Sequence, residues 1–130
     1  MGDHRHCRVS VLDGELELAG PPAALRALGR LLRQHAAHLE VAITDGVVIQ
    51  EETEGPLTVG LRDGATLHFS GRRGYLDIIW EALDGVADQA ETADAHGVNR
   101  HQHIEYLPGD EYRSPACVPL IIVADWPEPA

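Results

Sequence analysis

The sequence predicts an α+β domain in which hairpins form one antiparallel β-sheet and two helices pack on one face of it. Three Asp-Gly pairs, at residues 13–14, 45–46 and 63–64, each lie between apolar or alternating stretches, which is the strongest short-range signal of a β-hairpin. Two segments with apolar residues at intervals of three and four indicate amphipathic helices. The βαβ alternation of a nucleotide-binding fold is absent. We therefore expect one domain over residues 1–130.

The first third of the chain predicts a hairpin followed by a helix. Residues 7–11 and 15–18 alternate on either side of Asp13-Gly14, so we expect Val9 and Val11, with Leu16 and Leu18, to face the core. Gly20-Pro21-Pro22 then ends the second strand and opens a helix that is expected to reach His38. Its buried stripe is expected at Leu25, Leu28, Leu32, His35 and Leu39, and a basic stripe beside it at Arg26, Arg30 and Arg33.

The rest of the chain predicts further hairpins around a second helix. The strands are expected at residues 39–44, 47–50, 57–61, 65–70, 102–107 and 118–124. Residues 75–93 form the helix, which could kink at Gly85 because glycine costs about 1 kcal/mol relative to alanine there. Trp80 falls beside the apolar stripe of this helix, where core packing is the simpler interpretation and an exposed ring would indicate an interface.

The charge is strongly acidic and unevenly distributed. The chain carries 21 Asp and Glu residues against 10 basic residues, all of them Arg, for a net charge of −11. Residues 75–130 hold eleven of the acids and two of the arginines. This balance argues against nucleic acid and an anionic membrane surface as partners, and fits a basic protein partner or simple solubility. Because neither an apolar signal segment nor a run of about eighteen apolar residues is present, the expected location is the cytoplasm.

Acidic residues follow one face of the second predicted helix at intervals of three and four, without a basic residue between them. We call this set the acidic ridge: Asp77, Glu81, Asp84, Asp88, Glu91 and Asp94. Three interpretations remain open. The ridge is a solvated face, it pairs with the arginine stripe of the first helix, or it is a docking surface for a basic partner.

The second candidate site is the stretch HQHIEYLPGDEY at residues 101–112. His101, His103 and Glu105 would share one face of a strand, and two imidazoles with a carboxylate are suitable ligands for zinc or iron. The face that carries Ile104 must pack inward, so the three candidate ligands would point outward and converge poorly. A surface strand that recognises a partner is therefore favoured, with a metal-binding module or metal-dependent enzyme as the alternative. No P-loop, GxGxxG motif or nucleophile elbow indicates another enzyme.

The C-terminal third resembles a known family. The residues that carry the resemblance are His101-x-His103-Ile104-Glu105-Tyr106, Pro108-Gly109-Asp110-x-Tyr112, Ser114 and Pro119-Leu120-Ile121-Ile122. Together with the N-terminal hairpin and proline-opened helix of residues 9–32, they resemble the immunity protein 32 family, found beside bacterial polymorphic toxins. Where family members often have a polar residue after Ser-Pro, this chain has Ala116-Cys117. The resemblance implies a non-enzymatic protein without a cofactor that binds and neutralises a cognate toxin.

On this interpretation the expected toxin-binding residues form two sets. The first set is the acidic ridge, and the second comprises His101, His103, Glu105, Asp110, Glu111 and Tyr112. An acidic inhibitor would be steered electrostatically towards a basic toxin. A homodimer is a further hypothesis, in which the final strand at residues 118–124 pairs across a sheet edge.

Overall fold

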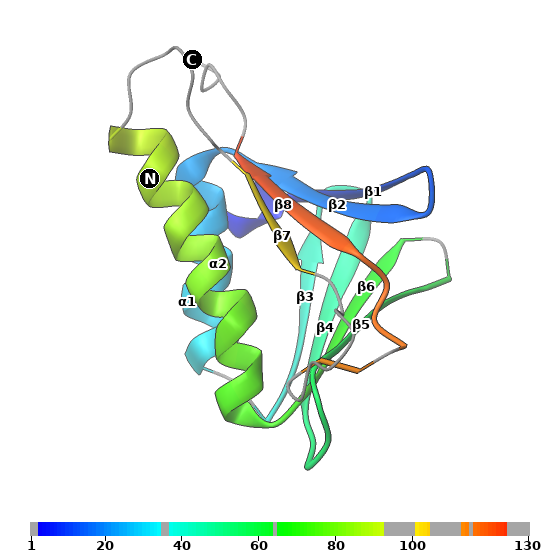
Figure 1. Cartoon of the computed structure of the whole chain (residues 1–130). Helices are drawn as coiled ribbons and strands as arrows, with labels where there is room; N and C mark the ends of the chain where they lie inside the picture. Colours follow the sequence, from blue (N-terminus) through cyan, green and yellow to red (C-terminus); the bar gives the residue numbers. More distant parts are fainter. Residues whose placement is uncertain are drawn as a thin grey trace.

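The computed structural model describes residues 3–34, 37–63, 65–92, 101–104, 113–114 and 116–124. Within these residues, a short 3₁₀ turn, two helices and eight strands follow one another along the chain (Figure 1). They are η1 (His4–His6), β1 (Arg8–Leu12), β2 (Glu15–Gly20), α1 (Pro22–Gln34), β3 (His38–Ile43), β4 (Gly46–Glu52), β5 (Thr58–Arg62), β6 (Thr66–Gly71), α2 (Arg73–Thr92), β7 (His101–Ile104) and β8 (Leu120–Ala124).

The α+β class is confirmed, but the strands form two four-stranded sheets where one was expected. Sheet A has the order β1-β2-β8-β7 and sheet B the order β3-β4-β6-β5. Each sheet contains one parallel pair, β2 with β8 and β4 with β6, so both sheets are mixed instead of antiparallel. β8 is hydrogen-bonded to β2 on one side and to β7 on the other, so it has no open edge. The hypothesis of a homodimer that pairs through residues 118–124 is therefore wrong.

All three predicted Asp-Gly hairpins are confirmed as β1–β2, β3–β4 and β5–β6. The aspartates Asp13, Asp45 and Asp63 adopt positive φ angles of 52°, 54° and 53°. Aspartate tolerates this left-handed conformation because its short polar side chain can interact locally, and the conformation matches the right-handed twist of the flanking strands. The turns therefore follow from local sequence alone.

The two sheets are joined at both margins. On one margin the Thr44 N–H donates to the Cys7 carbonyl at 2.9 Å, which connects the end of β3 to the start of β1. On the other margin, residues 113–114 and 116–118 run beside β5, where the Ser114 N–H donates to Leu57 O and the Val118 N–H to Val59 O. The edge of sheet B therefore leads directly into β8 of sheet A.

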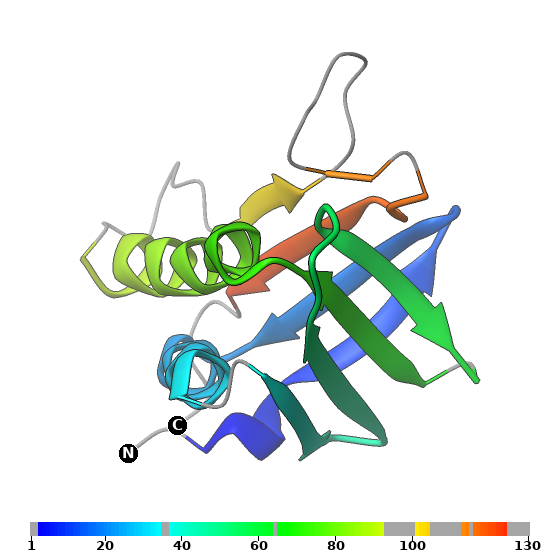
Figure 2. The same cartoon turned by 90° about the horizontal axis from the view of Figure 1, so that it is seen from below.

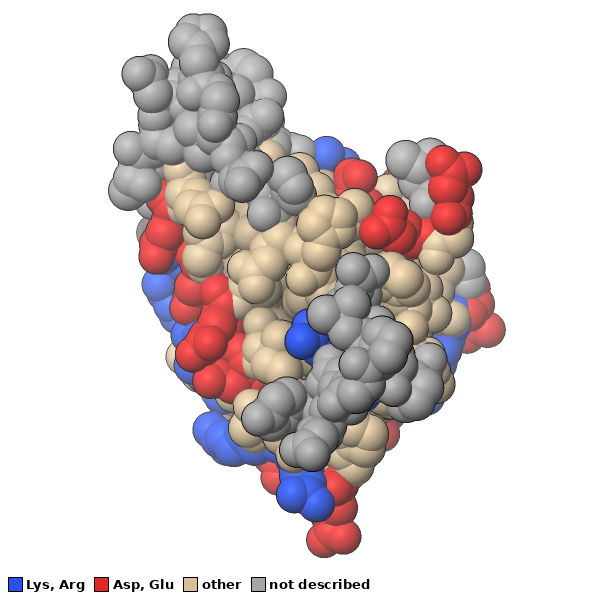
Figure 3. Space-filling model, viewed as in Figure 1, with Lys and Arg blue, Asp and Glu red and all other residues tan. Residues whose placement is uncertain are grey.

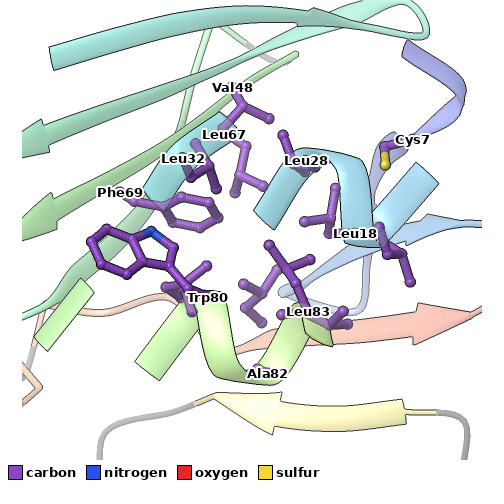
Figure 4. Close-up of a cluster of buried hydrophobic side chains, with 14 of the residues drawn as sticks. Cys7, Leu18, Leu28, Leu32, Val48, Leu67, Phe69, Trp80, Ala82 and Leu83 are labelled. Carbon is purple, nitrogen blue, oxygen red and sulfur yellow. The ribbon is translucent and has the colours of Figure 1, made fainter. Parts of the chain in front are cut away.

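Helices α1 and α2 lie together on one side of the molecule, beside the strands of both sheets (Figure 2). Leu28 and Leu32 of α1, Leu83 of α2 and Leu67 of β6 converge in a single core (Figure 4). The helices approach closely at Gly29, where a Cβ atom would lie 3.4 Å from the Cβ of Leu83.

The helix boundaries differ slightly from those predicted. α1 ends at Gln34 and not near His38, because the chain turns into β3 and the Ala37 carbonyl already accepts from the Glu52 N–H. α2 continues through Gly85 from residue 73 to residue 92, so the glycine does not end the helix. Trp80 is 3% exposed, which confirms core packing for this ring.

A buried amide connects both helices to sheet B. Gln50 of β4 is fully buried, and its Nε2 donates to the carbonyl oxygen of Leu32 at 2.8 Å. Its Oε1 accepts from Nε1 of Trp80 at 2.8 Å. Leu32 lies in the last turn of α1, where carbonyls lack a helical partner. Reversing the amide would set oxygen against oxygen and N–H against N–H, so these two partners fix its orientation.

We predict that Gln50→Leu lowers the free energy of unfolding by about 2–4 kcal/mol, because the Leu32 carbonyl and the Trp80 N–H both become buried groups without a partner. Denaturant unfolding measures this change. Gln102→Leu, at an exposed position of β7, is the matched control and should change stability by less than about 0.5 kcal/mol. Equal stability of the two variants would contradict a structural role for the buried amide.

Candidate functional site

The acidic ridge lies on α2 opposite its buried face. Of the ridge residues whose side chains are described, Glu81 and Asp88 are exposed and Asp77 and Asp84 are partly buried. The side chain of Glu91 and all of Asp94 lie outside the described residues. The buried residues of α2 whose side chains are described include Leu76, Ile79, Trp80, Ala82, Leu83, Val86 and Ala87. This periodicity places the four described acids on the side of the helix that faces away from the core.

Two ridge residues pair with the arginine stripe of α1. Nη2 of Arg26 lies 2.8 Å from Oδ1 of Asp88, and Nη2 of Arg33 lies 3.0 Å from Oδ2 of Asp84. The interpretation in which the ridge pairs with the first helix is therefore confirmed for these two acids. Because both pairs are partly exposed to water, each contributes about 1 kcal/mol or less to stability. Their charges are offset within the molecule.

Asp77 and Glu81 differ from the other two described ridge acids. Within the residues that the structure describes, neither has an ion-pair partner. The nearby Arg73 and Arg33 lie over the Trp80 ring, with guanidinium carbons 6.0 and 5.9 Å from its centroid. These two cations thus interact with the aromatic face. The N-terminal half of α2 consequently presents two unpaired carboxylates at i and i+4.

Of the candidate stretch at residues 101–112, the structure describes the first four residues, which form β7. Its alternation is confirmed, since Ile104 is 1% exposed and the side chain of His103 is 51% exposed. His103 Nδ1 lies 3.8 Å from Oε1 of Glu15 on β2. The side chain of His101 is not among those described, and the remaining predicted contact residues, Glu105, Asp110, Glu111 and Tyr112, lie outside the described residues.

A metal centre requires about three converging ligands. Among the described side chains, no group of three His, Cys, Asp or Glu residues has that arrangement. The contact of His103 with Glu15 is a distant one between partly exposed groups. Of the three predicted ligands, His103 alone has a described side chain.

The β1–β2 hairpin carries a second group of acids, which were not predicted as site residues from the sequence. Asp13 is exposed at the turn, and Glu15 and Glu17 are partly exposed on β2. Their alternation with the buried Leu16 and Leu18 is the sequence signal that could have placed them on the outer face of sheet A. Acidic side chains appear along the margin of α2 and again near this hairpin, with a mainly uncharged surface between them (Figure 3). Both groups therefore lie on one side of the molecule.

Both cysteines serve the structure. Cys7 is fully buried, and Cys117 Sγ accepts from the Val59 N–H at 3.2 Å and donates to the Leu57 carbonyl at 3.3 Å. These contacts hold the residues before β8 against β5.

Sheet B carries a separate titratable pair on its outer face. His68 is buried, and its Nε2 lies 3.2 Å from Oε1 of Glu51. The hydrogen bond from His68 lowers the pKa of the Glu51 carboxyl below its ordinary value of 4.5. A carboxylate whose folded pKa is depressed stabilises the fold above its unfolded pKa, and this contribution is lost as the pH falls through the folded pKa.

We predict that Glu51→Gln makes the free energy of unfolding less sensitive to acid. Between about pH 6 and pH 3, the wild type should lose more stability than the variant, because the variant has no depressed carboxyl to protonate. Denaturant titrations across this range measure the difference, with Glu40→Gln on the same sheet face as the charge-matched control. Parallel curves for the wild type and Glu51→Gln would contradict the assignment.

Comparisons with known proteins place the chain in a family context. A family model described as Immunity protein 32 matches residues 15–55 and 66–125. The matched ranges include α1, α2 with its acidic ridge, and the strand that carries His103. No curated protein and no solved structure shows significant similarity to the chain. Neither described helix is long and apolar enough to span a membrane.

Proposed function

The chain belongs to the immunity protein 32 family, and we propose that it is a non-enzymatic immunity protein that binds and neutralises a cognate toxin. The contact surface in this proposal is the exposed side of α2, with Asp77 and Glu81 as its main charges. The proposed partner is basic, and the proposed place of action is the cytoplasm.

The observation that carries the proposal is the family match over most of the chain, combined with the division of charge on α2. Asp84 and Asp88 are offset by arginines of α1, whereas Asp77 and Glu81 have no ion-pair partner among the described residues. Carboxylates that are fixed on a helix and lack a counter-charge attract a basic surface without first breaking an internal ion pair. Steering of this kind raises the rate of association and weakens as salt is added.

The proposed surface extends from α2 towards β7 and the β1–β2 hairpin. His103 contributes an exposed imidazole between the two acidic groups, and its neighbour across the sheet is Ile121 of β8. The rest of the acidic ridge and of the 101–112 stretch remains part of the proposal as predicted contact residues: Glu91, Asp94, His101, Glu105, Asp110, Glu111 and Tyr112. An uncharged centre with charged margins is common in protein interfaces.

We predict that the double variant Asp77→Lys/Glu81→Lys binds the toxin encoded beside this chain's gene about 30-fold more weakly than the wild type at low salt. The fold should survive, because neither carboxylate pairs with a described residue. Calorimetric titration measures the affinity, and the loss should shrink as salt is added.

The matched control for this variant carries the same charge change on sheet B. Glu40→Lys/Glu52→Lys reverses two exposed acids of β3 and β4 and should bind the toxin within about threefold of the wild type. Equal losses in the two variants would show that net charge alone acts. An unchanged affinity in Asp77→Lys/Glu81→Lys would remove α2 from the proposed surface.

A further inference from the structure

We infer that the partner also adds an extended segment as a strand to the outer edge of β1. The inference rests on the proposed function, because its occupant is a basic segment of the same toxin. It assigns a role to the β1–β2 hairpin, whose first strand lies entirely outside the residues matched by the family model. The contact would join backbone pairing at β1 to the charged surface of α2.

β1 is the edge strand of sheet A. Its inner neighbour is β2, and on its outer side the described residues supply a single bridge, between Arg8 and Thr44. Beyond Arg8, β1 and the turn extend away from sheet B towards the margin of the molecule (Figure 1). An edge strand in this position presents unpaired N–H and C=O groups to any chain that approaches it.

The geometry of the turn determines which groups face outward. Asp13 and Gly14 have φ angles of 52° and 79°, which is the two-residue type I′ turn. In such a hairpin the residues flanking the turn form a hydrogen-bonded pair, and the pairing then alternates along the ladder. Ser10 is therefore hydrogen-bonded to Glu17, whereas Val11, opposite Leu16, directs its N–H and C=O to the outer edge.

An independent contact confirms this alternation. Cys7 belongs to the same alternating set as Val11, and its carbonyl does point to the outer side, where it accepts from the Thr44 N–H at 2.9 Å. The start of the outer edge is thus already used for pairing within the molecule. Val9 follows in the same outward-facing set beside the Arg8–Thr44 bridge, and Val11 comes after it towards the turn.

The side chain of Val11 adds an apolar contact to the same position. It was expected to face the core, but it is 52% exposed because β1 lies at the end of sheet A, and it is the exposed large hydrophobic residue among those described. Edge strands are usually protected from pairing by a lysine, a proline or a covering loop, and β1 has neither lysine nor proline. An exposed apolar side chain beside free pairing groups is the pattern used in recognition by strand addition.

Charge indicates that the added strand comes from a basic partner and not from a second copy of this chain. The turn and β2 carry Asp13, Glu15 and Glu17, against Arg8 alone on β1. Pairing of two β1 strands about Val11 would bring two such acidic hairpins together, and each chain already has a net charge of −11. An added segment with Lys or Arg on the Ser10 face would instead reach across the short Ser10 side chain towards Glu17, the partner of Ser10 on β2.

The test removes the Val11 N–H without removing the hairpin. Val11→Pro is compatible with the fold because this N–H faces outward and makes no ladder bond to β2. Binding of the toxin encoded beside this chain's gene should weaken at least about 30-fold by calorimetry. Val11→Thr keeps the N–H and the branched shape, and should bind within about fivefold of the wild type.

The outcomes separate this inference from the proposed function. If Val11→Pro folds and binds as tightly as Val11→Thr, strand addition is overturned. Loss of binding in Asp77→Lys/Glu81→Lys would still support the proposed function in that case. A wild type that does not bind the toxin would overturn both.

If Val11→Pro does not fold, an ester linkage at position 11 replaces the N–H by oxygen. Binding by the ester within threefold of the wild type, by the same titration, would overturn the inference, and a loss of about tenfold or more would support it.

Discussion

The two hydrogen bonds of the buried Gln50 amide are the interaction on which the arrangement of the helices depends. Gln50 Oε1 accepts from the Trp80 indole N–H of α2, and Gln50 Nε2 donates to the Leu32 carbonyl at the end of α1. A single side chain of β4 therefore fixes both helices. In a dry core, a polar group of this kind is costly without its partners and strongly orienting with them. The close approach at Gly29 then fixes the spacing of the helices.

This arrangement also determines which acids are available to a partner. With the two helices held side by side, Arg33 reaches Asp84 and Arg26 reaches Asp88. The ring of Trp80, fixed by Gln50, lies beneath the guanidinium groups of Arg33 and Arg73. Arg33 and Arg73 thus lie near the N-terminal half of α2, but against the Trp80 ring, and neither forms an ion pair with Asp77 or Glu81. Of the four ridge acids whose side chains are described, Asp84 and Asp88 therefore pair with α1, and Asp77 and Glu81 have no ion-pair partner among the described residues.

The parts of this fold that could be predicted from sequence are those fixed by local chemistry. Asp13-Gly14 and its two counterparts encode hairpins through backbone conformations that few residues adopt, and the apolar periodicity of residues 75–93 encodes α2. The two sheets and their parallel pairs could not be predicted, because β2 pairs with β8 across about a hundred residues of chain. A strand that is central or at an edge has much the same alternating pattern, so the position of β8 was also not predictable.

In the candidate site, too, the features set by local sequence could be predicted and the contacts between distant elements could not. Helical spacing correctly placed Asp77, Glu81, Asp84 and Asp88 on one face, and strand alternation correctly turned Ile104 inward and His103 outward. The ion pairs required the rotation of one helix against the other, which no local pattern specifies. In the sequence, Gln50 is an ordinary polar residue of a strand. Its structural role depends on the hydrogen bond from the Trp80 indole, thirty positions later in the chain.

The central claim is that a partner binds on the unpaired carboxylates of α2 and not on the exposed face of sheet B. Carboxyl footprinting tests it most directly, by coupling exposed acids to an amine with a carbodiimide and reading each residue by mass spectrometry. In the complex with the toxin encoded beside this chain's gene, Asp77 and Glu81 should lose most of their labelling, while Glu40 and Glu52 keep theirs. Unchanged labelling of Asp77 and Glu81 with protection of Glu40 and Glu52 would contradict the claim.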